Sequence, residues 1–173
     1  AYQPTEQLIS LVQEAKREGF QIVVINDGSN TGTNDIFASA DRFGTVLHHV
    51  KNMGKGQAIK TGLSFIQGQY PADCTVVTLD ADGQHRIADA KRICKVAQNH
   101  PDALVLGSRR LKENVPIRSR VGNTITRFVY RISTGQRVWD AQTGLRAFST
   151  RLIPQFLSIP GERFYFILYF FLF

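Results

Sequence analysis

Short apolar runs alternate with helical segments over most of this chain, and that alternation constrains its fold more than any other feature. Runs rich in β-branched residues predict strands at 21–26, 45–50, 74–79 and 103–107. Helical periodicity predicts helices between them, at 8–15, 34–40, 57–67 and 87–98. Strands that alternate with helices favour a mostly parallel central sheet covered by helices on both faces. We therefore predict an α/β fold, and 173 residues fit a single domain.

The ends of the predicted elements are less sharply marked. Thr5 is a plausible cap for the first helix, and Gly19 is its expected end. Beyond residue 107 the alternation is lost. We expect a basic loop, an amphipathic helix at 118–133, an irregular stretch at 138–148 and a short helix at 150–157 that is interrupted near Pro154.

Two carboxylates follow the third predicted strand, in the sequence Asp80-Ala81-Asp82-Gly83-Gln84-His85. Open α/β sheets bind ligands at the carboxyl ends of their strands, and two acids at that point suit a divalent metal that bridges nucleotide phosphates. The alternative is an ordinary turn, because Asp and Gly both favour turns. An EF-hand loop is excluded, since the twelfth position counted from Asp80 is Lys91 and not a glutamate.

Two more polar loops follow predicted strands. The loop at 26–33 offers a carboxylate, hydroxyl groups and glycines that let backbone N–H groups approach a ligand, although a plain turn would look similar. The loop Asn52-Met53-Gly54-Lys55-Gly56 precedes a helix, and glycines with a lysine there suit a diphosphate. No Gly-Lys-Ser/Thr start is present, so the second loop is not a P-loop.

Composition narrows the class of partner. The net charge of +7 favours anionic partners such as phosphates or an acidic membrane surface, and the absence of an arginine-rich tract makes nucleic acid the weakest candidate. The two cysteines, Cys74 and Cys94, form no metal-binding spacing and are expected to be buried free thiols. The apolar stretch at 164–173 is too short to span a bilayer.

Together the loops resemble family 2 glycosyltransferases with the GT-A nucleotide-diphospho-sugar transferase fold. The resemblance is closest to polyprenyl-phosphate glycosyltransferases, the group that includes dolichol-phosphate mannose synthase. It covers nearly the whole chain as one glycosyltransferase catalytic domain, residues 1–173. The matching segments are Ala1 to Glu6, Asn26-Asp27-Gly28-Ser29, Gly54-Lys55-Gly56, Asp80 to His85, Gly107-Ser108-Arg109, Arg118 to Asn123 and Asp140 to Arg146.

The resemblance implies roles for the donor-site residues. Asp27 and Tyr2 would line the pocket for the base, Ser29 would belong to the same nucleotide-sugar site, and Lys55 would lie near the diphosphate or ribose. Asp80 would contact the ribose or the metal. The implied ligands of Mg²⁺ or Mn²⁺ are Asp80, Asp82 and Gln84. His85 would either contact the sugar or phosphates or serve as a structural residue of the turn.

The resemblance also implies a site for the acceptor. Arg109 and Arg118 would grip its phosphate, helped by Ser119 or Arg120, and the alternative is a solvated basic face. Asp140 either orients the acceptor or is a structural carboxylate. The implied catalytic residues are Asp80, Asp82, Arg109 and Arg118.

Two departures from the family pattern concern the ends of the chain. The family's first strand would precede Ala1, so we expect an N-terminal truncation that removes ladder partners and part of the base pocket. Near the C-terminus, Gly161-Glu162-Arg163-Phe164 begins like a family segment and then continues without an acid, which indicates truncation or an altered tail. That aromatic tail could pack on the core, lie in a membrane interface or join a second copy in a homo-oligomer.

The leading functional hypothesis is a metal-dependent, inverting enzyme. It would transfer a hexose from a UDP- or GDP-sugar to a polyprenyl phosphate. Such an enzyme would lie at the cytoplasmic face of a membrane, as a peripheral protein of cell-envelope synthesis. The alternatives are a family 2 glycosyltransferase with a saccharide acceptor and a non-catalytic nucleotide-sugar-binding module. The acceptor-phosphate arginines favour the lipid, because a neutral sugar hydroxyl would need a catalytic base.

Overall fold

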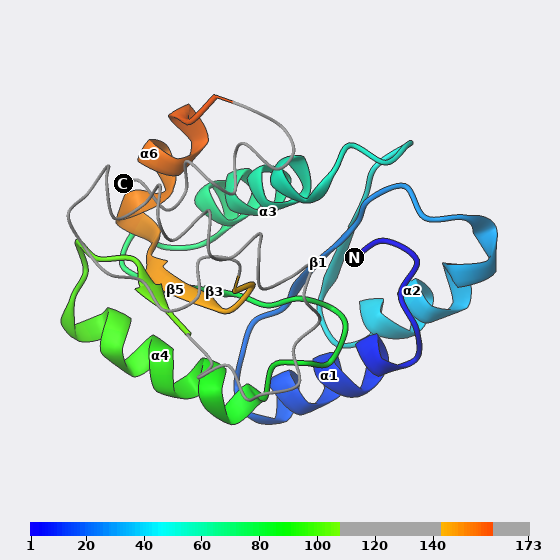
Figure 1. Cartoon of the computed structure of the whole chain (residues 1–173), viewed down its shortest axis with the longest axis horizontal. Helices are drawn as coiled ribbons and strands as arrows, with labels where there is room; N and C mark the ends of the chain where they lie inside the picture. Colours follow the sequence, from blue (N-terminus) through cyan, green and yellow to red (C-terminus); the bar gives the residue numbers. More distant parts are fainter. Residues whose placement is uncertain (108–142, 161–173) are drawn as a thin grey trace, which may run out of the picture.

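The computed structural model describes residues 1–107 and 143–160 (Figure 1). Helices and strands alternate through the first range as predicted. The elements are α1 (Gln7–Arg17), β1 (Val23–Asn26), η1 (Thr31–Thr33), α2 (Asn34–Asp41), β2 (Thr45–His48), α3 (Lys55–Gln69), β3 (Thr75–Thr78), α4 (Ile87–Asn99), β4 (Val105–Leu106), β5 (Arg146–Ser149), η2 (Thr150–Leu152) and α6 (Ile153–Ser158).

The described strands form two small sheets. β1 and β2 pair in parallel, with Val23 opposite Thr45 and Asn26 opposite His48. In the other sheet β5 lies between β3 and β4 and runs antiparallel to both. The mixed α/β class is confirmed, whereas the described strand pairs are one parallel and two antiparallel. The prediction of irregular structure at 138–148 was wrong for the residues of β5 that fall within it.

Helices cover the sheets from two sides. α3 and α6 lie together on one side, and α1 and α4 lie on the other, with β3 and β5 between them (Figure 1). Beneath α3 and α6, a core cluster includes Leu63, Val76, Phe148 and Phe156, and the two phenylalanine rings meet edge to face at 4.7 Å. A second cluster joins α1, β1 and α2 through Leu8, Val12, Val24, Phe37 and Ala40.

The ends of two helices differ in part from the predictions. The N-cap of α1 is Glu6, without a side-chain cap, so the prediction of Thr5 was wrong; Gly19 ends the helix as expected, at φ +86°. Pro154 lies in the first turn of α6 and does not interrupt it, because a proline there lacks only an N–H that a helix start leaves unpaired. The predicted helix at 118–133 lies outside the described residues.

The two cysteines are unbridged; Cys94 is buried as predicted, whereas Cys74 is only half-buried. Burial raises the pKa of the Cys94 thiol to about 11. Within residues 1–107 and 143–160, no helix combines the length and apolar character that crossing a membrane requires.

Candidate active site

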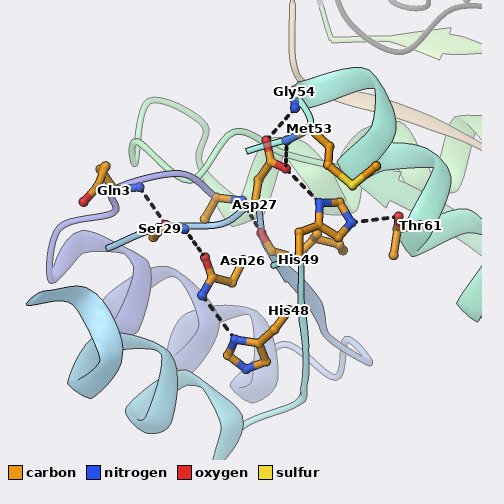
Figure 2. Close-up of polar contacts among 11 residues, drawn as sticks. Gln3, Asn26, Asp27, Ser29, His48, His49, Met53, Gly54 and Thr61 are labelled. Atoms are coloured by element: carbon orange, nitrogen blue, oxygen red, sulfur yellow. Dashed lines mark hydrogen bonds and ion pairs between the residues drawn. The ribbon is translucent and has the colours of Figure 1, made fainter. Parts of the chain in front are cut away.

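Asp27 lies directly after the carboxyl end of β1, and three donors bind its carboxylate (Figure 2). Oδ1 accepts hydrogen bonds from the backbone N–H of Met53 at 2.9 Å and from Nδ1 of His49 at 2.8 Å. Oδ2 accepts one from the N–H of Gly54 at 2.9 Å. The residue is only 4% exposed. Asp27 therefore fastens the loop that precedes α3 to the end of β1.

Opposing effects set the pKa of Asp27. Burial raises it, because the charged form loses water, while hydrogen bonds from the Met53 N–H, the His49 ring and the Gly54 N–H lower it. The hydrogen bonds prevail and hold the pKa below its ordinary value of 3.8. The carboxylate is therefore ionised at neutral pH.

Asn26 and Ser29 organise the other side of the same turn. Oδ1 of Asn26 accepts from the N–H of Ser29 at 2.9 Å, and its Nδ2 lies 3.1 Å from Nδ1 of His48 (Figure 2). The hydroxyl of Ser29 accepts from the N–H of Gln3 at 3.0 Å. Ser29 thereby holds the N-terminal segment that carries Tyr2.

Gly28 allows this turn to touch the next loop. It has a φ of +67°, and a Cβ at this position would lie 2.2 Å from the carbonyl carbon of Lys51 and 2.4 Å from the nitrogen of Asn52. Both neighbours are backbone atoms and cannot move as a side chain could. A glycine is therefore required for both conformation and space.

Lys55 connects the second loop to the third. It is the first residue of α3, directly after Gly54 at φ +93°, and its Nζ pairs with Oδ1 of Asp80. Nε2 of His85 lies 3.9 Å from Oδ2 of the same carboxylate. The side chains of Lys55 and Asp80 are 45% and 29% exposed, so water screens their attraction.

Asp82, Gly83 and Gln84 in the same loop are exposed to solvent, whereas the His85 side chain is only 8% exposed. Oδ1 of Asp82 accepts from the N–H of Gln84 at 3.0 Å, which is a local turn contact. Gly83 has a φ of +70°, and a Cβ there would meet nothing closer than 3.6 Å. Among the described residues, no three His, Cys, Asp or Glu side chains are grouped closely enough to hold a metal by themselves.

Gly144, two residues before the start of β5, lies against the Asp80 carboxylate. Its carbonyl accepts a hydrogen bond from Oγ1 of Thr78 at 3.0 Å. A Cβ on Gly144 would lie 2.2 Å from Oδ2 of Asp80. A side chain at this position would displace the carboxylate, so Gly144 sets where Asp80 can lie.

A cavity of about 660 Å³ brings the three loops together. Five residues predicted for the donor site belong to its lining, namely Tyr2, Asp27, Lys55, Asp80 and Asp82. Apolar side chains from α1, β1, α3 and β3 form other parts of the wall, including Leu8, Val24, Leu63 and Val76. The cavity therefore has polar groups where the strands end and an apolar wall along the strands.

Three predicted residues that the structure describes, Ser29, Gln84 and His85, do not belong to the lining of this cavity. Ser29 and Gln84 lie in the turns beside it. The residues predicted for the acceptor lie outside the described ranges, together with Asp140: Arg109, Arg118, Ser119 and Arg120. Sequence reasoning gave no role to His49, Thr61 or Gly144. The available signals were the adjacent imidazoles at 48 and 49, at the end of a predicted strand, and the matching segment Asp140 to Arg146, which contains Gly144.

Comparisons with known proteins agree on one family. The profile described as Glycosyl transferase family 2 matches residues 2–158. The chain is 32% identical over 155 residues to an uncharacterised protein of Methanocaldococcus jannaschii, an alignment that covers 86% of the chain and 62% of that protein.

Two other relatives have named activities. The chain is 33% identical over 145 residues to a dolichyl-phosphate beta-glucosyltransferase of Trichomonas vaginalis, covering 75% of the chain and 42% of the relative. It is 29% identical over 169 residues to a UDP-N-acetylglucosamine–dolichyl-phosphate N-acetylglucosaminyltransferase of Methanococcus voltae. That alignment covers 86% of the chain and 66% of the relative. The chain thus spans between 42% and 66% of the length of these three relatives.

Proposed function

Since the chain belongs to glycosyl transferase family 2, we propose that it transfers a hexose from a UDP- or GDP-sugar to a polyprenyl phosphate. In this reaction the bond between the sugar's anomeric carbon and the diphosphate breaks, and an acceptor phosphate oxygen forms the new bond. The nucleoside diphosphate leaves. The GT-A fold that the family implies is part of this proposal.

One observation carries the donor half of the proposal. Side chains from three separate loops, Asp27, Lys55 and Asp80, line one cavity at the ends of strands. Lys55 supplies a positive charge for phosphates, and its Nζ already lies against the Asp80 carboxylate. A nucleoside diphosphate needs both polar contacts and a cation, and this end of the cavity offers groups for each.

The residues of the Asp80 loop fit a divalent metal chemically. Asp80, Asp82 and Gln84 would present two carboxylates and an amide oxygen, which are the hard donors that Mg²⁺ and Mn²⁺ take. When bound, the metal would neutralise the charge that grows on the departing diphosphate. Lys55 lies beside the same carboxylate and would share that task.

The acceptor half rests on sequence and on relatives. Both named relatives carry dolichyl phosphate in their names. A lipid phosphate is already anionic, so it needs positioning and charge screening more than a general base. Arg109, Arg118, Ser119 and Arg120 would supply these, and the net charge of +7 would favour peripheral contact with an anionic membrane surface.

A transfer assay tests the proposal. The chain is incubated with a radiolabelled UDP- or GDP-hexose, Mn²⁺ and undecaprenyl phosphate in detergent micelles, and label in the lipid phase is measured. We expect transfer to the phosphate and none to undecaprenol, which lacks it. Transfer to a neutral oligosaccharide instead would support the saccharide-acceptor alternative, and donor binding without any transfer would support the non-catalytic module.

The matched variants are Asp82→Asn and Asp102→Asn. Asp102 is also exposed but lies in the turn before β4 and does not line the cavity. We expect the first variant to lose transfer and the second to keep it. Equal activity in both would show that the Asp80 loop has been misassigned.

A further inference from the structure

His49 lies between two elements that carry the donor site, and nothing in the proposed reaction yet uses it. It directly follows β2, and its backbone N–H donates to the carbonyl of Asn26 at 2.8 Å. Its ring spans from Asp27 to α3, with Nδ1 2.8 Å from Oδ1 of Asp27 and Nε2 2.9 Å from Oγ1 of Thr61 (Figure 2). The side chain is only 8% exposed.

The two partners assign the protons on this ring. Asp27 is ionised at neutral pH and can only accept, so Nδ1 must carry a proton. In the neutral ring Nε2 then has a lone pair, and the hydroxyl of Thr61 donates to it. Asp27 and Thr61 thus fix both the tautomer and the plane of the imidazole.

The same contacts fix the start of α3. His49 orients the carboxylate of Asp27, and this carboxylate accepts hydrogen bonds from the backbone N–H groups of Met53 and Gly54. Lys55 is the next residue after Gly54. Thr61, six positions further along α3, is held by the other ring nitrogen of His49. The imidazole that follows β2 therefore contacts α3 directly at Thr61 and also contacts the Asp27 carboxylate that holds Met53 and Gly54.

We propose that His49 is a positioning residue for the donor's diphosphate. It holds the turn at 53–54 and the first turn of α3, and so places Lys55 beside Asp80. This inference rests on the proposed function, because it assumes that Lys55 meets the diphosphate. His48 offers a neighbouring comparison, since it bonds to Asn26 on β1 and packs edge-on against Phe37 on α2.

Two substitutions separate the ring's two contacts. In His49→Asn the amide nitrogen takes the place of Nδ1 and keeps the contact to Asp27, whereas in His49→Gln it takes the place of Nε2 and loses that contact. Thr61→Val removes the other contact while keeping the side chain's shape. His48→Asn is the matched control on the adjacent residue.

Hydrogen exchange of the ligand-free protein tests the positioning directly. We expect His49→Gln to speed amide exchange at Met53 and Gly54 by about tenfold or more, as for the loss of a hydrogen bond to a charged group. His49→Asn should restore most of the protection, and His48→Asn should leave these amides unchanged. Unchanged exchange at Met53 and Gly54 in His49→Gln would overturn the inference.

Binding of UDP and UMP, or of GDP and GMP, in Mn²⁺ tests the link to the diphosphate. We expect His49→Gln to weaken binding of the nucleoside diphosphate by about tenfold and binding of the monophosphate by less than about twofold. Equal losses of affinity for the diphosphate and the monophosphate would overturn the role of His49 in the donor site and leave it a merely structural role. If the unchanged chain binds neither diphosphate, the proposed function fails and this role fails with it, while the exchange experiment still decides whether His49 holds the turn.

Discussion

The Asp27 turn and the Asp80 loop both follow strands and both carry acids, but they are built in opposite ways. Asp27 is buried, and three donors from residues 22 to 27 positions away bind its carboxylate. Asp80 is partly exposed beside a lysine, and Asp82 makes only a local turn contact. The first region is fixed by the fold, whereas the second leaves acidic oxygens facing solvent, where a cation could bind them.

The largest expected difference comes from neutralising one acid in each region. Asp27→Asn turns an amide group toward donors that need an acceptor, and should lower the free energy of unfolding by about 3 kcal/mol. In a chain of this size that corresponds to roughly 6–12 °C in the unfolding temperature. Asp80→Asn loses only a screened ion pair and should cost about 0.5 kcal/mol. Thermal unfolding of both variants measures the two losses of stability. Equal losses would contradict the difference between the Asp27 turn and the Asp80 loop.

Alanine at the glycine of each loop sharpens the comparison. Gly28 and Gly83 have nearly the same φ, +67° and +70°, so the conformational cost of alanine is similar at both. Only at Gly28 would the new Cβ also meet backbone, at 2.2 Å. We expect Gly83→Ala to cost about 1 kcal/mol and Gly28→Ala at least about 2 kcal/mol by urea unfolding. The account of a tight contact between the first two loops fails if the two variants are equally stable.

The contribution of Asp27 to the free energy of unfolding should be lost in acid. Its pKa in the folded protein is below the ordinary 3.8, so its contribution is complete above that pH and is lost as pH falls through the lower folded value. The difference in stability between the parent and Asp27→Asn should therefore be constant from about pH 6 to 5 and shrink below about pH 4. Urea unfolding at several pH values measures this difference, and a gap that grows on acidification would contradict the sign.

The smallest effect on stability is expected at Lys55. Its side chain is 45% exposed, and Lys55→Met should change the free energy of unfolding by less than about 0.5 kcal/mol. The same substitution should weaken binding of a nucleoside diphosphate more than binding of a monophosphate, because it removes a positive charge near the phosphates. Calorimetric titration with the four nucleotides separates the two effects, and an unchanged diphosphate affinity would place the phosphates elsewhere.

Sequence reasoning predicted the local features of both regions and missed their long-range partners. The helices at 7–17 and 87–99 follow from apolar periodicity, which is a property of neighbouring residues. Strand β5 was missed because all of its residues are buried, so neither alternation nor helical periodicity marks it. The resemblance assigned Asp27 to the base pocket, and its contacts with His49, Met53 and Gly54 depend on how distant loops meet.

The Asp80 loop, in contrast, could be predicted largely from the sequence. Its acids, its glycine and its place after a strand were all visible in the sequence, because the turn is local. What the sequence could not supply was the contact between this carboxylate and Gly144, which lies 64 residues further along the chain. The metal and acceptor roles stay predictions, and the acceptor residues lie outside the described ranges.

Thermal unfolding with UDP or GDP, each with and without Mn²⁺, shows whether the Asp80 loop forms a metal-assisted donor site. Ligand at about a hundredfold over its dissociation constant should add roughly 2.7 kcal/mol, or on the order of 5–10 °C. We expect this shift with one nucleotide, and only when Mn²⁺ is also present. The shift should be lost in Asp82→Asn and kept in Asp102→Asn. No shift with either nucleotide, or an equal shift without metal, would contradict a metal-assisted donor site at the Asp80 loop.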